Sequence, residues 1–212
     1  MNEKESVRTN QENLMNLKSL HVTKEMYAVY ALFFTSVYLA ASFQEWFAHK
    51  YLMHQTSYSL FDSLYKNHLL HHQNTLNDYT MKHGNAEYIC FDLFTMDGMV
   101  QTVVVYLSNV GVFYALFYPA VSMPVITGSI LVMIFVNIWV WNVVHSYVHG
   151  FDSSVICFPM GVPNRFILNN SFVKWLSDNH RKHHDNPKTH YNIVFPGADS
   201  IMGTRPTVKK IA

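Results

Sequence analysis

Two long stretches of this chain contain no charged residue, and this limits the folds that it can adopt. One runs from Met26 to Gln44 and the other from Gly98 to Gly150. About 20 apolar residues cross the hydrocarbon core of a bilayer as a helix, and Pro119 and Pro124 interrupt the second stretch near its middle. We therefore predict three transmembrane helices, near 26–47, 98–118 and 123–146. Buried helices of a water-soluble protein are the alternative, but GSILVMIFVNIWVWNVV lacks the polar face that a surface helix needs.

The composition agrees with a membrane protein and gives no sign of a nucleic-acid partner. Only 14% of the residues are charged, whereas about a quarter are charged in a typical soluble domain. The formal net charge of +1 comes without a basic stripe interleaved with aromatics. Residues 1–24 are expected to be a polar N-terminal tail, not a signal peptide, and residues 25–212 a single catalytic membrane domain. Cys90 and Cys157 have no CxxC context and are expected to be free thiols.

The positive charges predict which side of the membrane each segment occupies. With three spans, segments 48–97 and 147–212 share one face, and that face holds 11 of the 15 lysines and arginines counted along the chain. Because positive charge marks the cytoplasmic side, we place both segments, and the C-terminus, in the cytosol. The final KKIA resembles the dilysine retrieval signal of endoplasmic-reticulum membrane proteins, which favours that membrane.

Ten of the 13 histidines fall on this face, in the motifs HKYLMH, HLLHH, HSYVH and HRKHH. They are His49, His54, His68, His71, His72, His145, His149, His180, His183 and His184. Residues three and four apart share a helix face, so each triplet should present its three rings together, with Leu69 and Leu70 turned away toward the spans or the membrane interface. The spacing of five in HKYLMH separates the rings on a straight helix, so these two histidines serve different metals or the helix ends between them.

So many imidazoles in one place indicate a metal site. Without a metal they would repel one another when protonated and leave buried nitrogens unsatisfied when neutral. Ten ligands suffice for two ions, with more ligands each than the four that zinc prefers, and imidazole also binds iron. A histidine-only site for two metals at the membrane edge fits iron that activates dioxygen for a lipid substrate. His21 and His83 are expected to lie outside it, and His190 is a candidate neighbour.

The ordered set HxxxxH, HxxHH, HxxxH and HxxHH resembles the fatty-acid hydroxylase superfamily of membrane di-iron proteins, over roughly residues 40–204. Glu45, four residues before His49, matches an acidic position of the fatty-acid 2-hydroxylases. The segment HYNIVFPGADSIMGT resembles the closing segment of the family, with Asn192, Asp199, Gly203 and Thr204 at the matching positions. Lys50, Asn142 and Gly150 depart from positions common in the family and weaken any assignment to a subfamily.

The resemblance implies an all-α integral membrane protein whose cytosolic helical cap carries the ten histidines as ligands of two iron ions, with zinc as a substitute in isolated protein. Dioxygen would be the co-substrate, and the reaction would hydroxylate a fatty-acyl chain of a membrane lipid in lipid biosynthesis. Sterol desaturation or sterol methyl oxidation on the same scaffold is an alternative, and a metal transporter or sensor is a remote one.

The source of electrons and the partners of the ligands complete these expectations. The chain has no flavin, nicotinamide or haem motif, so electrons must come from another protein, such as cytochrome b5 and its reductase. Four side chains are candidates to orient the ligand rings through hydrogen bonds: Glu45, Asp185, His190 and Asp199.

Overall fold

The computed structural model describes residues 3–55, 61–157, 159, 161–163, 165 and 170–206, with side chains from residue 23 onward and without that of Asp97. The C-terminal lysines Lys209 and Lys210 lie outside the described residues. In this part of the chain the regular elements are helices, apart from one isolated bridge between Thr75 and Met81. The predicted all-α class is confirmed.

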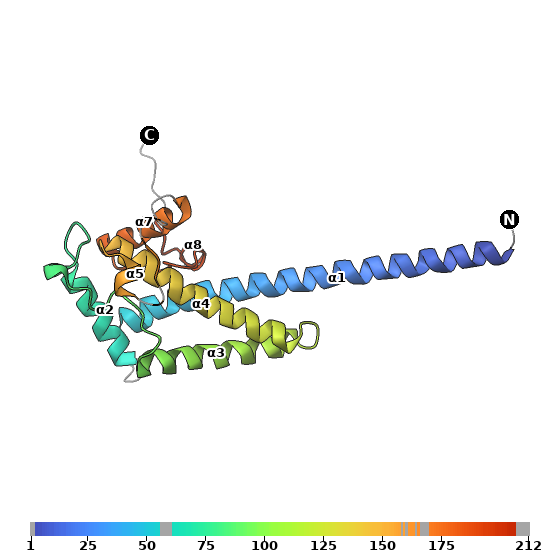
Figure 1. Ribbon diagram of the computed structural model, residues 1–212, viewed down its shortest axis with the longest axis horizontal. Coiled ribbons are helices and arrows are strands. Elements are labelled where there is room, and N and C mark those ends of the chain that lie inside the picture. The colour runs from blue at the N-terminus through green and yellow to red at the C-terminus, as the bar shows by residue number, and fades with distance from the viewer. Residues whose placement is uncertain are drawn as a thin grey trace.

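The helices follow one another with short connections. In chain order they are α1 (Glu3–Phe47), the π-helix η1 (Ala48–Met53), α2 (Asp62–Asn74), the 3-10 helix η3 (Lys82–Gly84), α3 (Met96–Phe117), α4 (Met123–Val148), α5 (Ser153–Ile156), α7 (Ser171–Asp185) and α8 (Ala198–Ile201). Helix α1 includes most of the polar segment 1–24 and projects away from the rest of the molecule (Figure 1).

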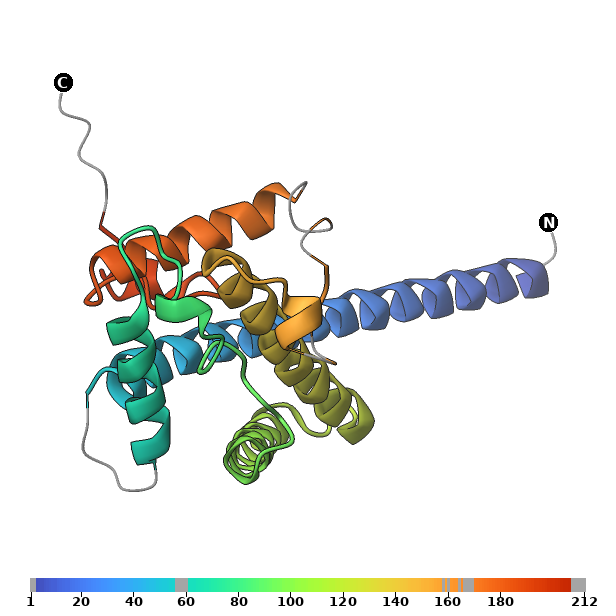
Figure 2. The ribbon, with the colours of Figure 1, turned by 60° about the vertical axis from the view of Figure 1, so that its left-hand side comes forward.

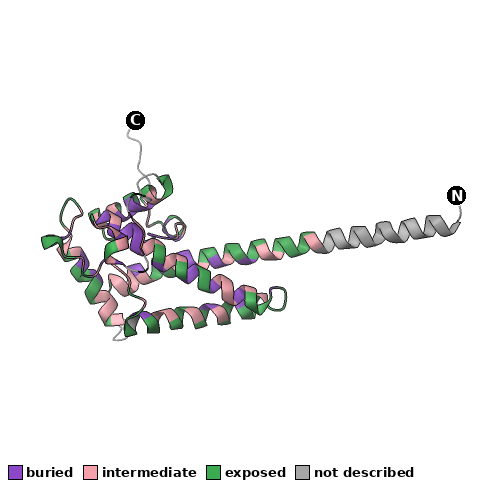
Figure 3. Ribbon diagram, viewed as in Figure 1, coloured by how far each residue is buried: buried purple, intermediate pink, exposed green. Residues whose placement is uncertain are grey.

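Three helices are long and apolar enough to cross a membrane, as predicted, over Thr23–Met53, Gly98–Phe117 and Met123–Val148. Their outer faces carry large exposed hydrophobic side chains, including Val104 and Leu107 on α3 and Val132 and Phe135 on α4. These faces are green in Figure 3. Side chains of this kind suit contact with lipid tails.

The three spans pack through aliphatic and aromatic side chains that recur at every fourth residue. On α1 these are Phe33, Val37 and Ala41, and on α4 they are Ile126, Ile130, Ile134 and Ile138. Phe33 also meets Phe113 of α3 edge to face, with ring centroids 5.8 Å apart. Lipid tails are as apolar as these side chains, so close van der Waals packing rather than hydrophobic burial holds the helices together.

Polar side chains fix where α3 and α7 begin. Thr95 accepts a hydrogen bond from the backbone N–H of Gly98, and Asn170 accepts from those of Phe172 and Val173. Each cap satisfies N–H groups that a helix start leaves without partners. The caps thereby fix the residues at which the membrane-length helix α3 and the histidine-bearing helix α7 begin.

A cap of shorter elements covers one end of the spans. Helices α2 and α7 and the loop leading to α8 gather where α1 and α4 end, far from the α3–α4 connection and from the N-terminus (Figures 1 and 2). Helix α4 contacts both α3 and α7, and η1 contacts α2. The chain thus brings all four histidine motifs to one end of the bundle.

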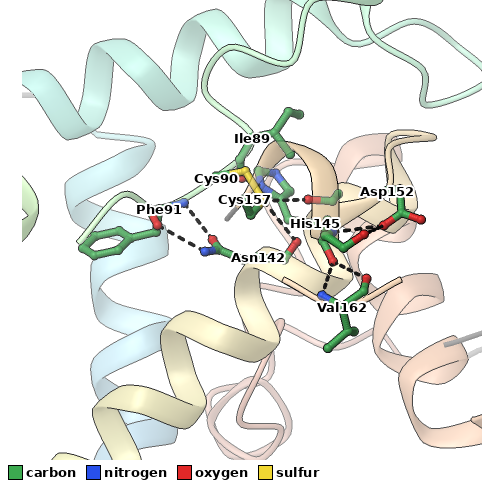
Figure 4. The surroundings of a disulfide bond; sticks show 11 residues. Ile89, Cys90, Phe91, Asn142, His145, Asp152, Cys157 and Val162 are labelled. Carbon is green, nitrogen blue, oxygen red and sulfur yellow. Dashed lines mark hydrogen bonds between the residues drawn. A yellow bond between two sulfur atoms is a disulfide. The ribbon is translucent and has the colours of Figure 1, made fainter. Parts of the chain in front are cut away.

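The prediction of two free thiols is wrong. Cys90 and Cys157 form a disulfide with a Cα–Cα distance of 5.5 Å (Figure 4). It joins the loop before α3 to the residue that follows α5. The two cysteines are 67 positions apart, so only the folded cap reveals that they are neighbours.

Candidate metal centre

The ten predicted histidines lie together, and nine of them form two groups that are each suited to hold a metal ion. Within each group the ring nitrogens lie within 4.8 Å of one another, and the groups are His71, His145, His149, His180 and His184, and His49, His54, His68 and His183. The tenth, His72, adjoins the second group. Its Nε2 is 3.1 Å from that of His68 and 3.2 Å from that of His183.

Each HxxHH triplet presents its three rings together, as predicted, with centroids at most 5.9 Å apart on α2, but the rings are divided between the two groups. On α2, His68 and His72 face one group while His71 faces the other. The triplet of α7 divides in the same way, because His183 separates from His180 and His184. Two helices shared by both groups place the two candidate metal positions side by side.

A π-helix explains the spacing of five in HKYLMH. The α1 helix gives way at Ala48 to η1, and His54 is its C-cap. A π-helix has i→i+5 hydrogen bonds, so His49 and His54 fall on the same side. Their rings stack with centroids 5.3 Å apart, and both belong to one group. Of the two alternatives, the assignment of the two histidines to different metals is therefore wrong, whereas the helix does end between them, at Met53.

Backbone carbonyl groups orient four of the rings. A carbonyl only accepts hydrogen bonds, so each Nδ1 must carry the proton and donate. The pairs are His49 with Tyr191 at 2.7 Å, His149 with Tyr79 at 2.6 Å, His183 with Thr189 at 2.8 Å and His145 with Ile89 at 2.5 Å. In a neutral imidazole this leaves Nε2 as a bare lone pair that faces the interior of the group.

The facing Nε2 atoms fit a bound cation. Those of His145 and His71 are 3.0 Å apart, and those of His49 and His68 are 3.2 Å apart. Two nitrogens that each lie about 2.1 Å from one ion, at a right angle, are about 3 Å apart. The Nε2 of His149 is buried without a hydrogen-bond partner. A metal ion would satisfy lone pairs that otherwise repel or stay unpaired.

Burial keeps these rings in the neutral form that binds metals. It lowers the pKa of His54 and of His149 to about 4, and that of His72 to about 3. Burial and the neighbouring imidazoles hold the pKa values of His71 and His180 well below the usual range. Neutral imidazole is a common metal ligand, so the site needs no deprotonation near neutral pH.

Glu45 does not fill its candidate role of accepting a hydrogen bond from the ring of His49. It holds the adjacent loop instead. Its carboxylate accepts the backbone N–H groups of Ile193, Val194 and Phe195 at 2.8, 2.7 and 2.8 Å. These residues directly follow Tyr191, whose carbonyl orients His49. Glu45 thus influences the orientation of His49 indirectly, through this loop.

Asp199 and Asp185 have the same indirect relationship to the rings. Asp199 accepts the backbone N–H groups of Tyr191 and Asn192 at 3.0 and 2.7 Å. Asp185 accepts from the hydroxyl of Tyr79 at 2.9 Å, and the carbonyl of Tyr79 orients His149. Neither carboxylate fills its candidate role of bonding a ligand ring directly, because the carbonyls of Tyr191 and Tyr79 occupy the positions next to Nδ1 of His49 and His149.

His190 and His83 lie outside both groups. His190 is buried, and its Nδ1 meets the hydroxyl of the adjacent Thr189 at 2.9 Å. His190 is therefore a neighbour of a residue that orients His183 and has no place in either group. His83 is exposed, as expected, and the side chain of His21 lies outside the described residues.

Asn142 is a functional position that the sequence showed only as a departure from the family pattern. Its side-chain amide pairs with the backbone N–H and carbonyl of Phe91 at 2.8 and 3.2 Å (Figure 4). Two residues earlier, Ile89 supplies the carbonyl that orients His145. An amide in an apolar span, one turn before a ligand, was the available signal.

A cavity of about 420 Å³ leads from the spans to the histidines. Its wall includes side chains of α1, α3 and α4, such as Ala41, Val105 and Ile134, and it reaches His49, His68 and His145. Both groups therefore touch one cavity that extends between the membrane-spanning helices.

Comparisons with protein-family models, with curated proteins and with solved structures give no match. The site is therefore defined by its own geometry: a buried histidine-rich cluster, able to hold metal, at one end of three membrane-length helices.

Proposed function

We propose that this protein is an O2-dependent di-iron oxidoreductase that hydroxylates a membrane lipid and belongs to the fatty-acid hydroxylase superfamily. The observation that carries the proposal is the double histidine group, five rings on each side, beside a cavity between the spans. Five nitrogens exceed the need of a structural zinc site and suit iron. The order of the four motifs supports the family.

The cavity favours a lipid substrate. Its lining includes Met133, Ile134, Ile138 and Trp141 of α4, and these belong to a helix of membrane length. An acyl chain dissolved in the bilayer can reach such a cavity without passing through water. A fatty-acyl chain is the proposed substrate, and a sterol is the alternative that product analysis would reveal.

The residues of the chain have defined tasks in this reaction. Two iron ions held by the histidines would supply the reduction of dioxygen and the oxidation of an unactivated C–H bond. The carbonyls of Tyr191, Tyr79, Thr189 and Ile89 fix the tautomers of their rings. The cavity places one carbon beside the rings and excludes water, which is the protein's contribution through positioning. The two electrons would come from a separate donor such as cytochrome b5 with its reductase.

The proposed location is the endoplasmic-reticulum membrane, with the histidine cap in the cytosol. The excess of lysine and arginine on the cap supports this side. The disulfide between Cys90 and Cys157 points the other way, since disulfides are rare in the cytosol. The charge distribution carries the proposal, and the proposed orientation requires that the bridge seen in the structure forms only outside the reducing cytosol.

The function is tested by metal and product analysis of the purified protein. Wild type and His71→Ala are compared for iron content and for lipid products formed with oxygen and an electron donor, with His83→Ala as the matched control. Iron and an oxygen-dependent hydroxylated lipid are expected for wild type and the control only. Well-folded protein that holds zinc alone and yields no oxygen-dependent product would refute the proposal.

A further inference from the structure

Four uncharged polar side chains line the cavity within the spans, and one of them, Gln44, pairs with Asn109. Of the other three, Gln101 and Thr102 come from α3 and Asn137 comes from α4. Within the part of the chain that the structure describes, none of the three side chains has a hydrogen-bond partner. Unpaired amide and hydroxyl groups are costly in a hydrocarbon environment. They are therefore placed to bind a polar group that enters the cavity.

The hairpin geometry puts these groups at one depth. Thr102 lies about four helical turns before the end of α3. Asn137 lies about four helical turns after the start of α4. The two helices are joined by a short connection and contact each other. Asn137 is about two turns, roughly 12 Å, from His145 along α4. The polar level and the metal centre are thus separated along the cavity.

Away from the histidines, the described lining of the cavity offers no basic side chain. Among the described lining residues the charged ones are Glu45 and Asp92, with no lysine or arginine. Glu45 is held by backbone N–H groups, and Asp92 accepts the N–H of Phe94 at 2.9 Å. A carboxylate or phosphate at the level of Thr102 and Asn137 would find no lysine or arginine among the described lining residues to pair with.

We propose that the cavity selects a lipid whose buried part carries a neutral hydrogen-bonding group, a hydroxyl or an amide, and rejects one whose buried part is anionic. Thr102 and Asn137, with Gln101, bind that group. The carbon presented to the histidines then lies roughly 12 Å further along the chain of the lipid. This assignment of substrate class rests on the proposed function.

Binding to the full-length protein in nanodiscs tests the assignment without requiring turnover. The probes are tritiated hexadecanol, hexadecanoate and hexadecane, and the variants are Thr102→Val and Asn137→Leu. Wild type should bind hexadecanol at least about tenfold more tightly than hexadecanoate. Each variant should lose about tenfold in affinity for hexadecanol and keep its affinity for hexadecane.

Thr127→Val is the matched control. Thr127 is on α4, the helix that carries Asn137, and its hydroxyl donates to the carbonyl of Met123. It should bind every probe like wild type. Asn137→Ser replaces Asn137→Leu if the latter does not fold. Equal binding of hexadecanol and hexadecanoate, or variants that bind hexadecanol normally, would overturn the assignment.

The outcomes also separate this assignment from the proposed function. Selective binding that depends on Thr102 and Asn137, without any oxygen-dependent product, would refute the hydroxylase and leave the binding site standing. Oxygen-dependent hydroxylation of a lipid with an anionic buried part, as efficient as that of a neutral one, would refute the assignment and leave the hydroxylase standing.

Discussion

His49 donates from Nδ1 to the backbone carbonyl of Tyr191, 2.7 Å away, although 142 positions separate the two residues. The bond fixes the tautomer of the ring and directs Nε2 toward the other histidines. The same arrangement recurs at three other carbonyls: Tyr79, Thr189 and Ile89 accept from His149, His183 and His145. Except for Thr189, which is six positions from His183, these carbonyls lie far from their ligands in sequence, so distant loops help determine the geometry of the candidate metal centre.

Replacing Glu45 by glutamine should weaken the orientation of the His49 ring, although the side chain of residue 45 does not bond to that ring. The amide nitrogen of Glu45→Gln would face N–H groups of Ile193 to Phe195 that now donate to a carboxylate oxygen. We expect a loss of about 1–3 kcal/mol in the free energy of unfolding and a lower metal content. Thermal unfolding and elemental analysis of the purified protein measure both effects.

Asp62→Asn is the control for Glu45→Gln, because Asp62 pairs with Lys66 on an exposed face of α2. It removes a carboxylate of little energetic weight and should leave metal content unchanged. Normal stability and metal content in Glu45→Gln would show that the loop needs no carboxylate.

Removing two ligands from one group should release one metal and spare the other. His145→Ala/His149→Ala affects the first group, and His49→Ala/His54→Ala affects the second. We expect each double variant to bind about half of the metal of wild type, because too few ligands remain at one position. Elemental analysis of folded protein measures the ratio, and His83→Ala should leave it unchanged. Loss of all metal from either double variant would indicate one merged site.

Much of the fold was predictable because membrane spans depend on composition along a continuous stretch. Uncharged runs and two prolines were enough to predict three membrane-length helices, and helical spacing identified the ten histidines that lie together. These features need only local periodicity and a count of charges.

The remaining details depend on contacts that leave little trace in the sequence. A backbone carbonyl such as that of Tyr191 or Ile89 is available on any residue, so no side chain marks it as a partner of a ligand. The π-helix that unites His49 with His54 breaks the usual helical period. The Cys90–Cys157 bridge joins segments that only the folded cap brings together.

Leu69 and Leu70 should be dispensable for metal binding although they lie inside a ligand motif. Both are 38% exposed, while His68 and His71 on the same helix are buried. We expect Leu69→Ser and Leu70→Ser to keep the metal content of wild type and to change the free energy of unfolding in detergent by less than about 1 kcal/mol. His71→Ala is the neighbouring comparison and should lose metal. Metal loss from folded Leu70→Ser would contradict the orientation of α2.

Acidification should destabilise the metal-free protein, because its clustered histidines stay neutral in the folded state. Burial lowers the pKa of His54 and His149 to about 4, whereas the pKa of an unfolded histidine is about 6.5. Between these values the unfolded chain binds more protons. The free energy of unfolding should therefore fall below about pH 6.5, by up to about 1.4 kcal/mol per pH unit for each such histidine, and stay level above it.

Thermal unfolding in detergent with a chelator measures this dependence from about pH 8 to about pH 5. The midpoint should be constant at first and then decline as the pH passes below about 6.5. His83→Gln replaces an exposed histidine outside both groups and should follow the same curve as wild type. A midpoint that is constant over the whole range would contradict a cluster of neutral buried rings.

The state of Cys90 and Cys157 in cells should reveal the side of the membrane on which the histidine cap lies. Their Cα atoms are 5.5 Å apart, a separation at which a bridge forms without backbone movement. In a cytosolic cap glutathione keeps such a pair reduced, so both cysteines should react with a maleimide reagent when only the plasma membrane is opened. The bridge should then form after purification in air, and Cys90→Ser should leave a single reactive thiol in both settings. Cysteines that react only after the inner membranes are dissolved and a reductant is added would place the cap in an oxidising lumen and reverse the proposed orientation.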